Sequence, residues 1–404
     1  MEVKSKTEDI EPELPTKILN KTFISILLAN TSMLLAMMMG NSLIAKYADF
    51  LGAVPAVVGF VTGIFAATSL LFKSISGPAI DSFNRRLILM GATIIMAIAF
   101  FGFSISVSIP MMIFFRLLQG IGMAFFGPCC LALASDSLPK DKFGSGIGVY
   151  SMGQAAALAV APSIALWLFG LFGYRATFTI GGCMMIFAAL VASMIKNPKR
   201  NKKEFHISIN NMLAKEAIIP TIILFILALA FTAIGSFLII YAGVLGVENI
   251  GFYFMVYAGT MLFTRPVIGK LTDRLGIVKI IIPAIFCFAI SFLIISYATV
   301  LWMFLLAAFV ASFGFGACQP AIQTLAMKTV NPERRGAASS TVFIAMDTAF
   351  FIGPILAGTI VGLFGYTTMW RVTLIPMGIA FIIVIFSRKF IMQVEEAFKE
   401  RNQN

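Results

Sequence analysis

Long hydrophobic stretches dominate the chain, and short polar segments separate them. A helix that crosses the roughly 30 Å hydrocarbon layer of a bilayer needs about 20 mainly apolar residues, with every backbone group paired inside the helix. The pattern predicts an all-α membrane protein with twelve transmembrane helices, six in each half. We place them at about residues 22–45, 54–74, 87–107, 110–135, 145–169, 176–195, 217–243, 250–268, 279–299, 301–327, 337–361 and 371–388.

The two halves of the chain repeat each other. The word GLFGY occurs at residues 170–174 and again at 362–366, which is 192 positions later. The same offset relates several further residues, and no insertion is needed from about residue 55 to about residue 175. The related pairs are Gly77 and Gly269, Asp81 and Asp273, Gly122 and Gly314, Pro128 and Pro320, Gly144 and Gly336, Pro162 and Pro354, and the like-charged Lys73 and Arg265.

Such a repeat predicts two pseudo-symmetric six-helix bundles, at residues 22–195 and 217–388. A central loop at 196–216 would join them, with an N-terminal tail at 1–21 and a C-terminal tail at 389–404. The glycines of each GLFGY word would turn the chain at an extracellular corner, where Tyr174 and Tyr366 would lie at the membrane interface.

Composition and charge agree with a membrane protein and set its orientation. The chain has 59% hydrophobic and only 12% charged residues, far from the usage of soluble domains. Its net charge is +12, but the pattern assigns most Lys and Arg, including Lys73 and Arg265, to the tails and to turns on one side of the membrane. We therefore expect a plasma-membrane protein with both termini in the cytoplasm, in contact with lipid and not with nucleic acid. The basic segment KNPKRNKK at 196–203 would serve orientation, with a regulatory or lipid-binding role as the alternative.

The sequence holds no sign of an enzyme. All five cysteines fall inside predicted helices without metal-binding spacing, and the lone histidine, His206, belongs to the central loop. No nucleophile triad, phosphate-binding loop or metal cluster is recognisable. We expect no catalytic residues, no cofactor and no metal.

Two turns of related sequence join the second helix of each half to the third. They read GPAIDSFNRR at 77–86 and GKLTDRLGIVK at 269–279. Each turn has a glycine, then an aspartate four positions later, then basic residues, and this pattern resembles the signature of the major facilitator superfamily. The first turn departs from the signature, because Ser82 and Asn84 stand where the superfamily usually has a basic residue and a glycine. The matching positions are Gly77, Asp81, Arg85, Arg86, Gly269, Asp273, Arg274 and Gly276.

The resemblance extends from about residue 20 to about residue 390 and implies the fold of that superfamily. It also implies that the two turns form a breakable cytoplasmic latch. Glycine allows close approach of helices, and a carboxylate is stabilised at a helix N-terminus. The alternative is that these charges only cap helix ends and orient the loops.

The fourth helix carries RLLQGIG, from Arg116 to Gly122, which resembles the Arg-x-x-Gln-Gly motif of the superfamily. This similarity implies a role for Arg116 in proton transfer or in the translocation cavity. Alternatively, Arg116 lies close enough to the start of its helix for its side chain to reach the outer surface.

Small residues and prolines in the fourth, fifth and eleventh helices predict close packing and bending. The fifth helix has Ala161 before Pro162, where efflux members of the superfamily often carry glycine, and this departure weakens the case for antiport. The expected packing and hinge residues are Gly120, Gly122, Pro162, Gly353 and Pro354.

Asp347 is the single acidic residue well inside a predicted span. It begins about ten residues into its helix, roughly 15 Å deep. Burial there favours the neutral acid, whereas water or a cation favours the carboxylate, so alternating exposure would take up and release a proton. The alternative is a fixed interhelical strut, since the residue that the repeat relates to Asp347 is Ala155.

The remaining polar residues at membrane depth are sparse and suit an amphipathic organic solute better than a sugar. The candidate cavity residues are Asn30, Asn41, Gln119, Gln154, Tyr241, Gln319 and Gln323. We expect a monomeric secondary transporter that exports a small amphipathic compound by alternating access, coupled to protons. The alternatives are coupled or facilitated uptake of a metabolite or of an organic anion paired with Arg116, and a transporter-like sensor or lipid flippase.

Overall fold

The computed structural model describes residues 17–139, 143–195, 213–331 and 334–403. The predicted basic segment, His206 and most of the N-terminal tail and central loop lie outside these residues. Within them the chain is helical and contains no strand. The predicted all-α fold is confirmed.

The N-terminal half comprises α1 (Lys21–Phe50), α2 (Pro55–Ser82), α3 (Arg85–Ile105), α4 (Ile109–Asp136) and α5 (Phe143–Ser193). Local sequence sets where several of these helices begin. The side chain of Asn20 accepts a hydrogen bond of 2.9 Å from the backbone N–H of Phe23, and that of Asn84 accepts one of 3.0 Å from Arg86. Both are N-cap contacts that satisfy donors at the first turn of a helix.

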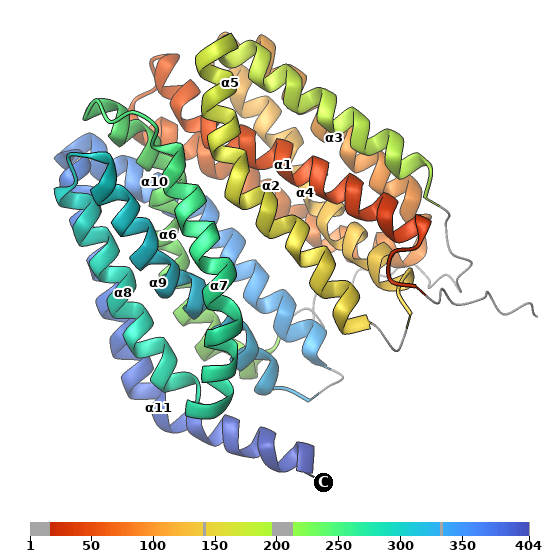
Figure 1. Cartoon of the computed structure of the whole chain (residues 1–404), viewed down its shortest axis with the longest axis vertical. Coiled ribbons are helices and arrows are strands. Elements are labelled where there is room, and N and C mark those ends of the chain that lie inside the picture. Colours follow the sequence, from red (N-terminus) through yellow and green to blue (C-terminus); the bar gives the residue numbers. More distant parts are fainter. Residues whose placement is uncertain (1–16, 140–142, 196–212, 332–333, 404) are drawn as a thin grey trace, which may run out of the picture.

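The C-terminal half begins with a short 3₁₀ helix, η2 (Lys215–Ala217). It continues with α6 (Ile218–Val244), α7 (Gly251–Leu275), α8 (Ile277–Tyr297), α9 (Leu301–Lys328), α10 (Arg335–Val372) and α11 (Leu374–Gln403). Residues 389–403, expected as a tail, continue α11 as helix, which leads to the C-terminus at the bottom of Figure 1.

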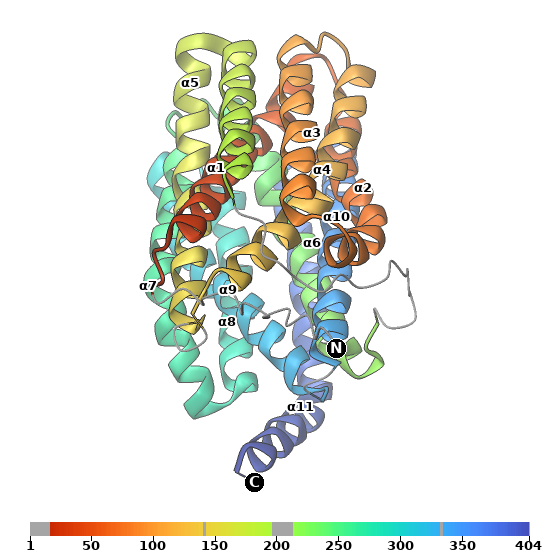
Figure 2. The same cartoon turned by 90° about the vertical axis from the view of Figure 1, so that its right-hand side faces the viewer.

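The second glycine of each GLFGY word breaks a long helix, in agreement with the predicted turn. Gly173 interrupts α5 at φ 73° and Gly365 interrupts α10 at φ 80°. Figure 2 shows α5 as two adjacent lengths that meet at the top of the view. The tyrosine after each break stacks on a ring of the first helix in its half: Tyr174 on Tyr47 with centroids 4.5 Å apart, and Tyr366 on Tyr241 at 5.6 Å.

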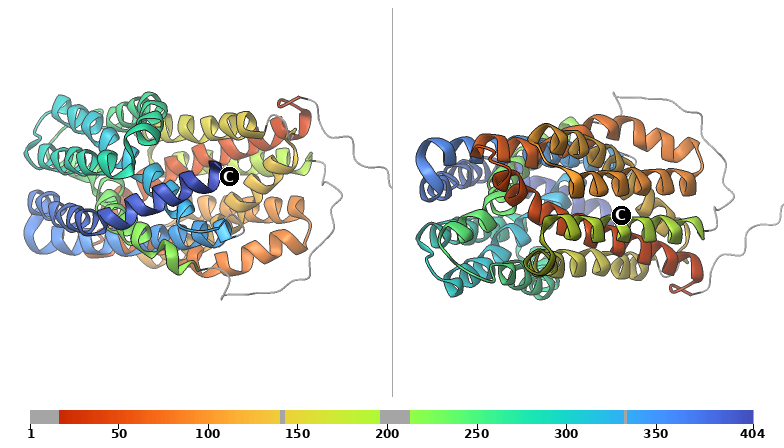
Figure 3. Two further views of the ribbon diagram at one scale, coloured as in Figure 1. Left: turned by 90° about the horizontal axis from the view of Figure 1, so that it is seen from below. Right: turned by 90° about the horizontal axis from the view of Figure 1, so that it is seen from above.

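Nine stretches of the described residues are long and apolar enough to cross a membrane. Two of them, Ala159–Ser193 and Ala337–Phe398, contain the breaks at Gly173 and Gly365. Helix α7 is not among the nine, and its second half carries several cations. The count of twelve spans therefore stays a prediction, whereas the two-bundle fold is evident in Figure 3, where the red-to-yellow and green-to-blue halves lie side by side.

The most extensive contacts between the halves are those of α2 with α10 and of α5 with α7, and α6 also contacts α1 and α2. A Cβ atom on Gly59 would overlap the carbonyl oxygen of Pro354 and lie 3.1 Å from the Cα of Ile355. A Cβ on Gly251 would lie 3.0 Å from the Cα of Ser163. Gly59 and Gly251, like Ser163 and Ile355, are separated by the 192-residue repeat, so the two contacts are pseudo-symmetric copies of each other.

Candidate functional site: a cavity between the two halves

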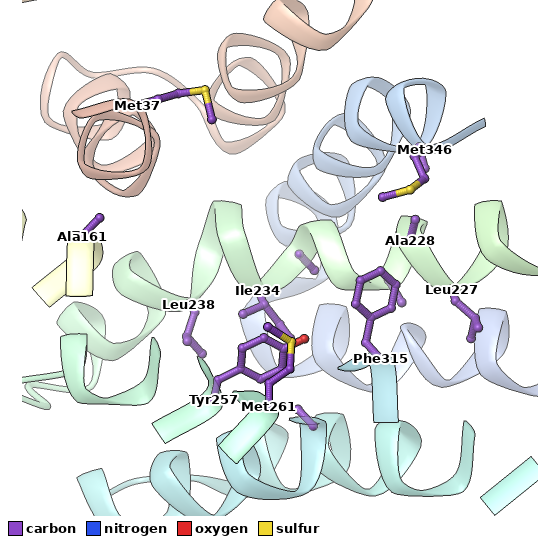
Figure 4. Close-up of a cluster of buried hydrophobic side chains, with 14 of the residues drawn as sticks. Met37, Ala161, Leu227, Ala228, Ile234, Leu238, Tyr257, Met261, Phe315 and Met346 are labelled. Carbon is purple, nitrogen blue, oxygen red and sulfur yellow. The ribbon is translucent and has the colours of Figure 1, made fainter. Parts of the chain in front are cut away.

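A cavity of about 440 Å³ lies between the two bundles, lined by four helices of the N-terminal half and four of the C-terminal half. Its wall is mainly apolar. Figure 4 shows part of that wall, with Tyr257 and Met261 of α7, Phe315 of α9 and Met346 of α10 in one hydrophobic cluster. The ring of Phe315 stacks on that of Phe231, with centroids 4.2 Å apart and planes within 9°.

The repeat also relates the two helices that supply opposite walls of the cavity. Helix α2 contributes Thr62, Phe65, Ser69 and Lys73, and the offset of 192 carries these to Phe254, Tyr257, Met261 and Arg265 of α7. All eight residues line the cavity. The duplicated chain therefore brings the same faces of both helices to one shared space.

The helices that line the cavity pack closely against the other half at one end and lie farther apart toward the other. Along α2, the first residues pack against the other half: side chains at Gly59 and Gly63 would overlap carbonyl oxygens of Pro354 and Phe351. Farther along, α2 lines the cavity, and a Cβ at Gly77 would meet no described atom within 4 Å. Figure 1 shows the matching course of α5 and α7, which converge near the top and diverge below.

Arg116 lies inside the bundle, only 1% exposed, and lines the cavity. It donates hydrogen bonds to the side-chain oxygens of Asn41 at 2.8 Å and Gln119 at 2.6 Å. It also donates to the carbonyl oxygens of Val61, at 3.0 Å, and Thr62. Its guanidinium is 4.3 Å from the centroid of the Phe65 ring. The alternative in which Arg116 reaches the outer surface is wrong, because α2 and α1 supply acceptors that hold the side chain inward.

Asp347 of α10 forms an ion pair with Lys73 of α2, across the boundary between the halves. The side chains are 18% and 25% exposed, and both line the cavity. The sequence analysis placed Lys73 and Arg265 in cytoplasmic turns. This placement is wrong, because each lies more than two helical turns before the end of its helix.

The other predicted cavity residues divide into two groups. Asn41 and Gln319 line the cavity, and Gln119 joins it through Arg116. Three residues do not belong to the wall as the structure describes it: Asn30 accepts from the hydroxyl of Tyr150 at 3.0 Å, Tyr241 packs on Tyr366 and Trp370, and Gln323 donates to the sulfur of Met346 at 3.7 Å. The side chain of Gln154 lies outside the described part of the chain.

The predicted latch residues lie where α2 and α7 end, away from the close contacts at Gly59 and Gly251. No described atom would touch a Cβ at Gly77 or Gly269, so neither glycine serves close approach in this conformation. Arg85 donates to the carboxylate of Asp136, Arg86 is half-buried and Arg274 is exposed. The side chains of Asp81 and Asp273 lie outside the described residues.

The sequence analysis missed a carboxylate in the second turn. Gly276 has φ 88°, and the next backbone N–H, of Ile277, donates to both oxygens of Glu395 at 3.0 and 3.1 Å. The nitrogen of Lys328 lies 4.0 Å from the same carboxylate. Glu395 belongs to α11 and is far from Ile277 in sequence, so no local motif predicts this hydrogen bond.

The predicted packing residues mostly act within one half. A Cβ at Gly120 would overlap the carbonyl of Phe65, one at Gly122 the side chain of Met96, and one at Gly353 the hydroxyl of Thr232. Pro162 and Pro354 line the cavity, and Pro354 also abuts Gly59. The close approach between halves comes instead from Gly59, Gly63, Gly251 and Gly358.

The family model described as Major Facilitator Superfamily matches residues 24–248 and 220–403. The chain belongs to this superfamily. The match covers both bundles, in agreement with the resemblance of the two turns. The chain is thus a membrane transporter of that superfamily by descent and fold.

The relatives that the chain resembles in sequence include drug-efflux pumps. The chain is 27% identical over 365 residues to the multi-drug resistance efflux pump PmrA of Streptococcus pneumoniae, covering 84% of this chain and 88% of that protein. It is 24% identical over 339 residues to the multidrug resistance protein MdtG of Salmonella paratyphi C, covering 77% and 81%.

Solved structures share the fold at low identity. A bacterial homologue of the human lysosomal transporter Spinster superposes with a TM-score of 0.75 at 18% identity, covering 94% of this chain and 99% of that one. The nucleoside transporter NupG gives 0.70 at 14% identity, covering 92% and 98%.

Proposed function

We propose that the protein exports a small amphipathic organic compound by alternating access, driven by protons. The observation that carries this proposal is the mainly apolar cavity between two pseudo-symmetric halves, whose helices pack closely together at one end only. Such a cavity at the interface of repeats is where secondary transporters bind their substrates. The efflux relatives PmrA and MdtG support export.

The direction of opening suits loading from inside the cell. The closed end is where α2 and α7 begin, and the wide end is where these helices finish, close to the latch turns. If both termini are cytoplasmic, as the charge pattern predicts, the wide end faces the cytoplasm. In export, an amphipathic compound enters there, and closure of the latch turns then opens the opposite end.

The ion pair between Lys73 and Asp347 is the proposed coupling element. Protonation of Asp347 would remove the negative charge and with it the attraction between α2 and α10. Because the pair joins the two halves, gain or loss of this proton changes how strongly they are held together. A proton arriving from outside would thereby be exchanged for substrate.

The test is transport by purified protein in proteoliposomes, with a compound first selected by its ability to raise the melting temperature of the protein. An imposed pH gradient should drive accumulation. Asp347→Asn should abolish the driven component and leave substrate exchange, whereas Glu248→Gln, at an exposed carboxylate, should transport normally. Gradient-driven transport that persists in Asp347→Asn would eliminate Asp347 as the coupling residue, and accumulation in the opposite direction in cells would show uptake.

A further inference from the structure

Four charged side chains line the cavity among the residues described: Lys73, Arg116, Arg265 and Asp347. Three are cations and one is an anion. The cations therefore outnumber the anions, and at least one cation has no carboxylate partner in the cavity wall among the described residues.

Two of the cations are already engaged. Lys73 is paired with Asp347, the only carboxylate among the described residues of the wall. Arg116 is almost fully buried and donates to four oxygen acceptors of the protein, which occupy most of the N–H donors of its guanidinium. Arg265, in contrast, is exposed to the cavity and takes part in none of the hydrogen bonds or ion pairs found within the described parts of the chain.

The repeat explains why Arg265 lacks a carboxylate. The offset of 192 relates Lys73 to Arg265, but it relates Asp347 to Ala155. Both halves thus supply a cation at the same level of the cavity, and only one half supplies the anion.

We propose that Arg265 binds an anionic group of the substrate, so that the transported compounds are aromatic organic anions. This inference rests on the proposed transport function. A guanidinium binds a carboxylate through two parallel hydrogen bonds, which orient the ligand as well as attract it. The aromatic body would lie against Met261 and Tyr257, one and two turns before Arg265 on α7, and against the stacked pair Phe231 and Phe315. The cavity volume of about 440 Å³ falls in the range that holds such small ligands.

The test uses three probes with one ring system and different charge: 2-naphthoate, neutral 2-naphthamide and cationic 2-naphthylmethylammonium. Their affinities for purified protein in a neutral detergent are measured by titration calorimetry. We expect 2-naphthoate to bind at least tenfold more tightly than 2-naphthamide, with the ammonium compound weakest. Equal binding of all three, or preference for the ammonium compound, would overturn the inference.

Variants assign the preference to Arg265. Arg265→Gln should reduce the difference between 2-naphthoate and 2-naphthamide to less than threefold, whereas Arg265→Lys should keep most of it. Lys270→Gln, which removes an exposed cation from the same helix outside the cavity, should leave it intact. An unchanged preference in Arg265→Gln protein with an unaltered melting temperature would refute the role of Arg265.

These experiments distinguish failure of the proposed anion site from failure of the proposed transport function. If 2-naphthoate binds through Arg265 but no tested compound crosses the proteoliposome membrane, the proposed transport function fails and the anion site stands. If neutral or cationic compounds are exported and the charge preference is absent, transport stands and the anion site fails.

Discussion

The contact of α2 with α10 and the contact of α5 with α7 have the same shape and different chemistry. In both contacts, a glycine near the start of one helix packs directly against the backbone of the other helix: Gly59 of α2 against α10, and Gly251 of α7 against α5. The first contact continues into the ion pair of Lys73 and Asp347, whereas in sequence the repeat relates these two residues to Arg265 and Ala155. The duplication preserved the packing but not the charges.

The same difference recurs elsewhere in the two halves. The repeat relates Arg116 of α4 to Ala308 of α9, so a hydrogen-bonded arginine on one side corresponds to a fully buried alanine on the other. Close packing at the closed end needs small residues in both halves, because both carry the same backbone approach. A buried polar group needs partners only where it occurs, so the polar chemistry can differ between halves without altering the scaffold.

Arg116→Leu would make this position apolar in both halves and should have the largest effect. The side-chain oxygens of Asn41 and Gln119 would lose a charged donor, at about 1–3 kcal/mol for each unsatisfied group. We expect the free energy of unfolding to fall by about 2–5 kcal/mol, measured by thermal or denaturant unfolding in detergent. Arg388→Leu, at an exposed arginine, is the control, and an equal effect of both changes would contradict the structural role of Arg116.

Alanine at the two related glycines should separate two contacts that look equivalent in sequence. At Gly59 the new methyl group would overlap a backbone oxygen, which cannot move independently of α10. At Gly251 it would lie 3.0 Å from the Cα and the hydroxyl oxygen of Ser163, where a small shift suffices. We expect Gly59→Ala to cost about 1–3 kcal/mol of stability and Gly251→Ala less than about 1 kcal/mol.

Transport rates of the same two glycine variants test whether the contacts at Gly59 and Gly251 take part in the transport cycle. Gly59→Ala should be the slower, because it weakens the state in which this end is closed. Equal stability and equal rates in both variants would show that the halves do not meet as described.

The ion pair of Lys73 and Asp347, which occurs only in the contact of α2 with α10, should contribute less to the free energy of unfolding. Because Lys73 and Asp347 keep 25% and 18% of their side-chain surface, solvent screening reduces the value expected for a fully buried pair. We expect Lys73→Met and Asp347→Asn each to lower the free energy of unfolding by about 1–2 kcal/mol. The double variant should lose no more than the worse single variant, and strict additivity would show that the two side chains do not interact.

The sequence predicted the symmetric part of the molecule better than the asymmetric part. The 192-residue offset indicated which residues of α2 and α7 correspond, and GLFGY located both helix breaks. It did not reveal that Lys73 meets Asp347, because these residues are not related by the repeat and are far apart in sequence. The sequence also could not distinguish Asn41, in the cavity wall, from Asn30 on the same helix. A helix that is apolar on all sides has no hydrophobic pattern that shows which face points into the cavity.

The smallest effect is expected at the helix that follows each latch turn. The repeat relates Asn84 to Gly276, and both precede a helix, but the cap differs: Asn84 caps α3 with its own side chain, whereas α8 receives the carboxylate of Glu395 from α11. A carboxylate at a helix N-terminus contributes about 0.5–1 kcal/mol. Asn84→Ala and Glu395→Gln should each destabilise by about that amount, but in different places.

Hydrogen exchange distinguishes the two caps. Asn84→Ala should raise exchange only in the first turn of α3, because its cap is local. Glu395→Gln should raise exchange both in the first turn of α8 and in the end of α11, because one contact holds the two segments together. Glu396→Gln, at the adjacent exposed carboxylate, should change neither. If Glu395→Gln affected α8 alone, α11 would be held by its apolar packing, and the second latch turn would be as independent of distant segments as the first.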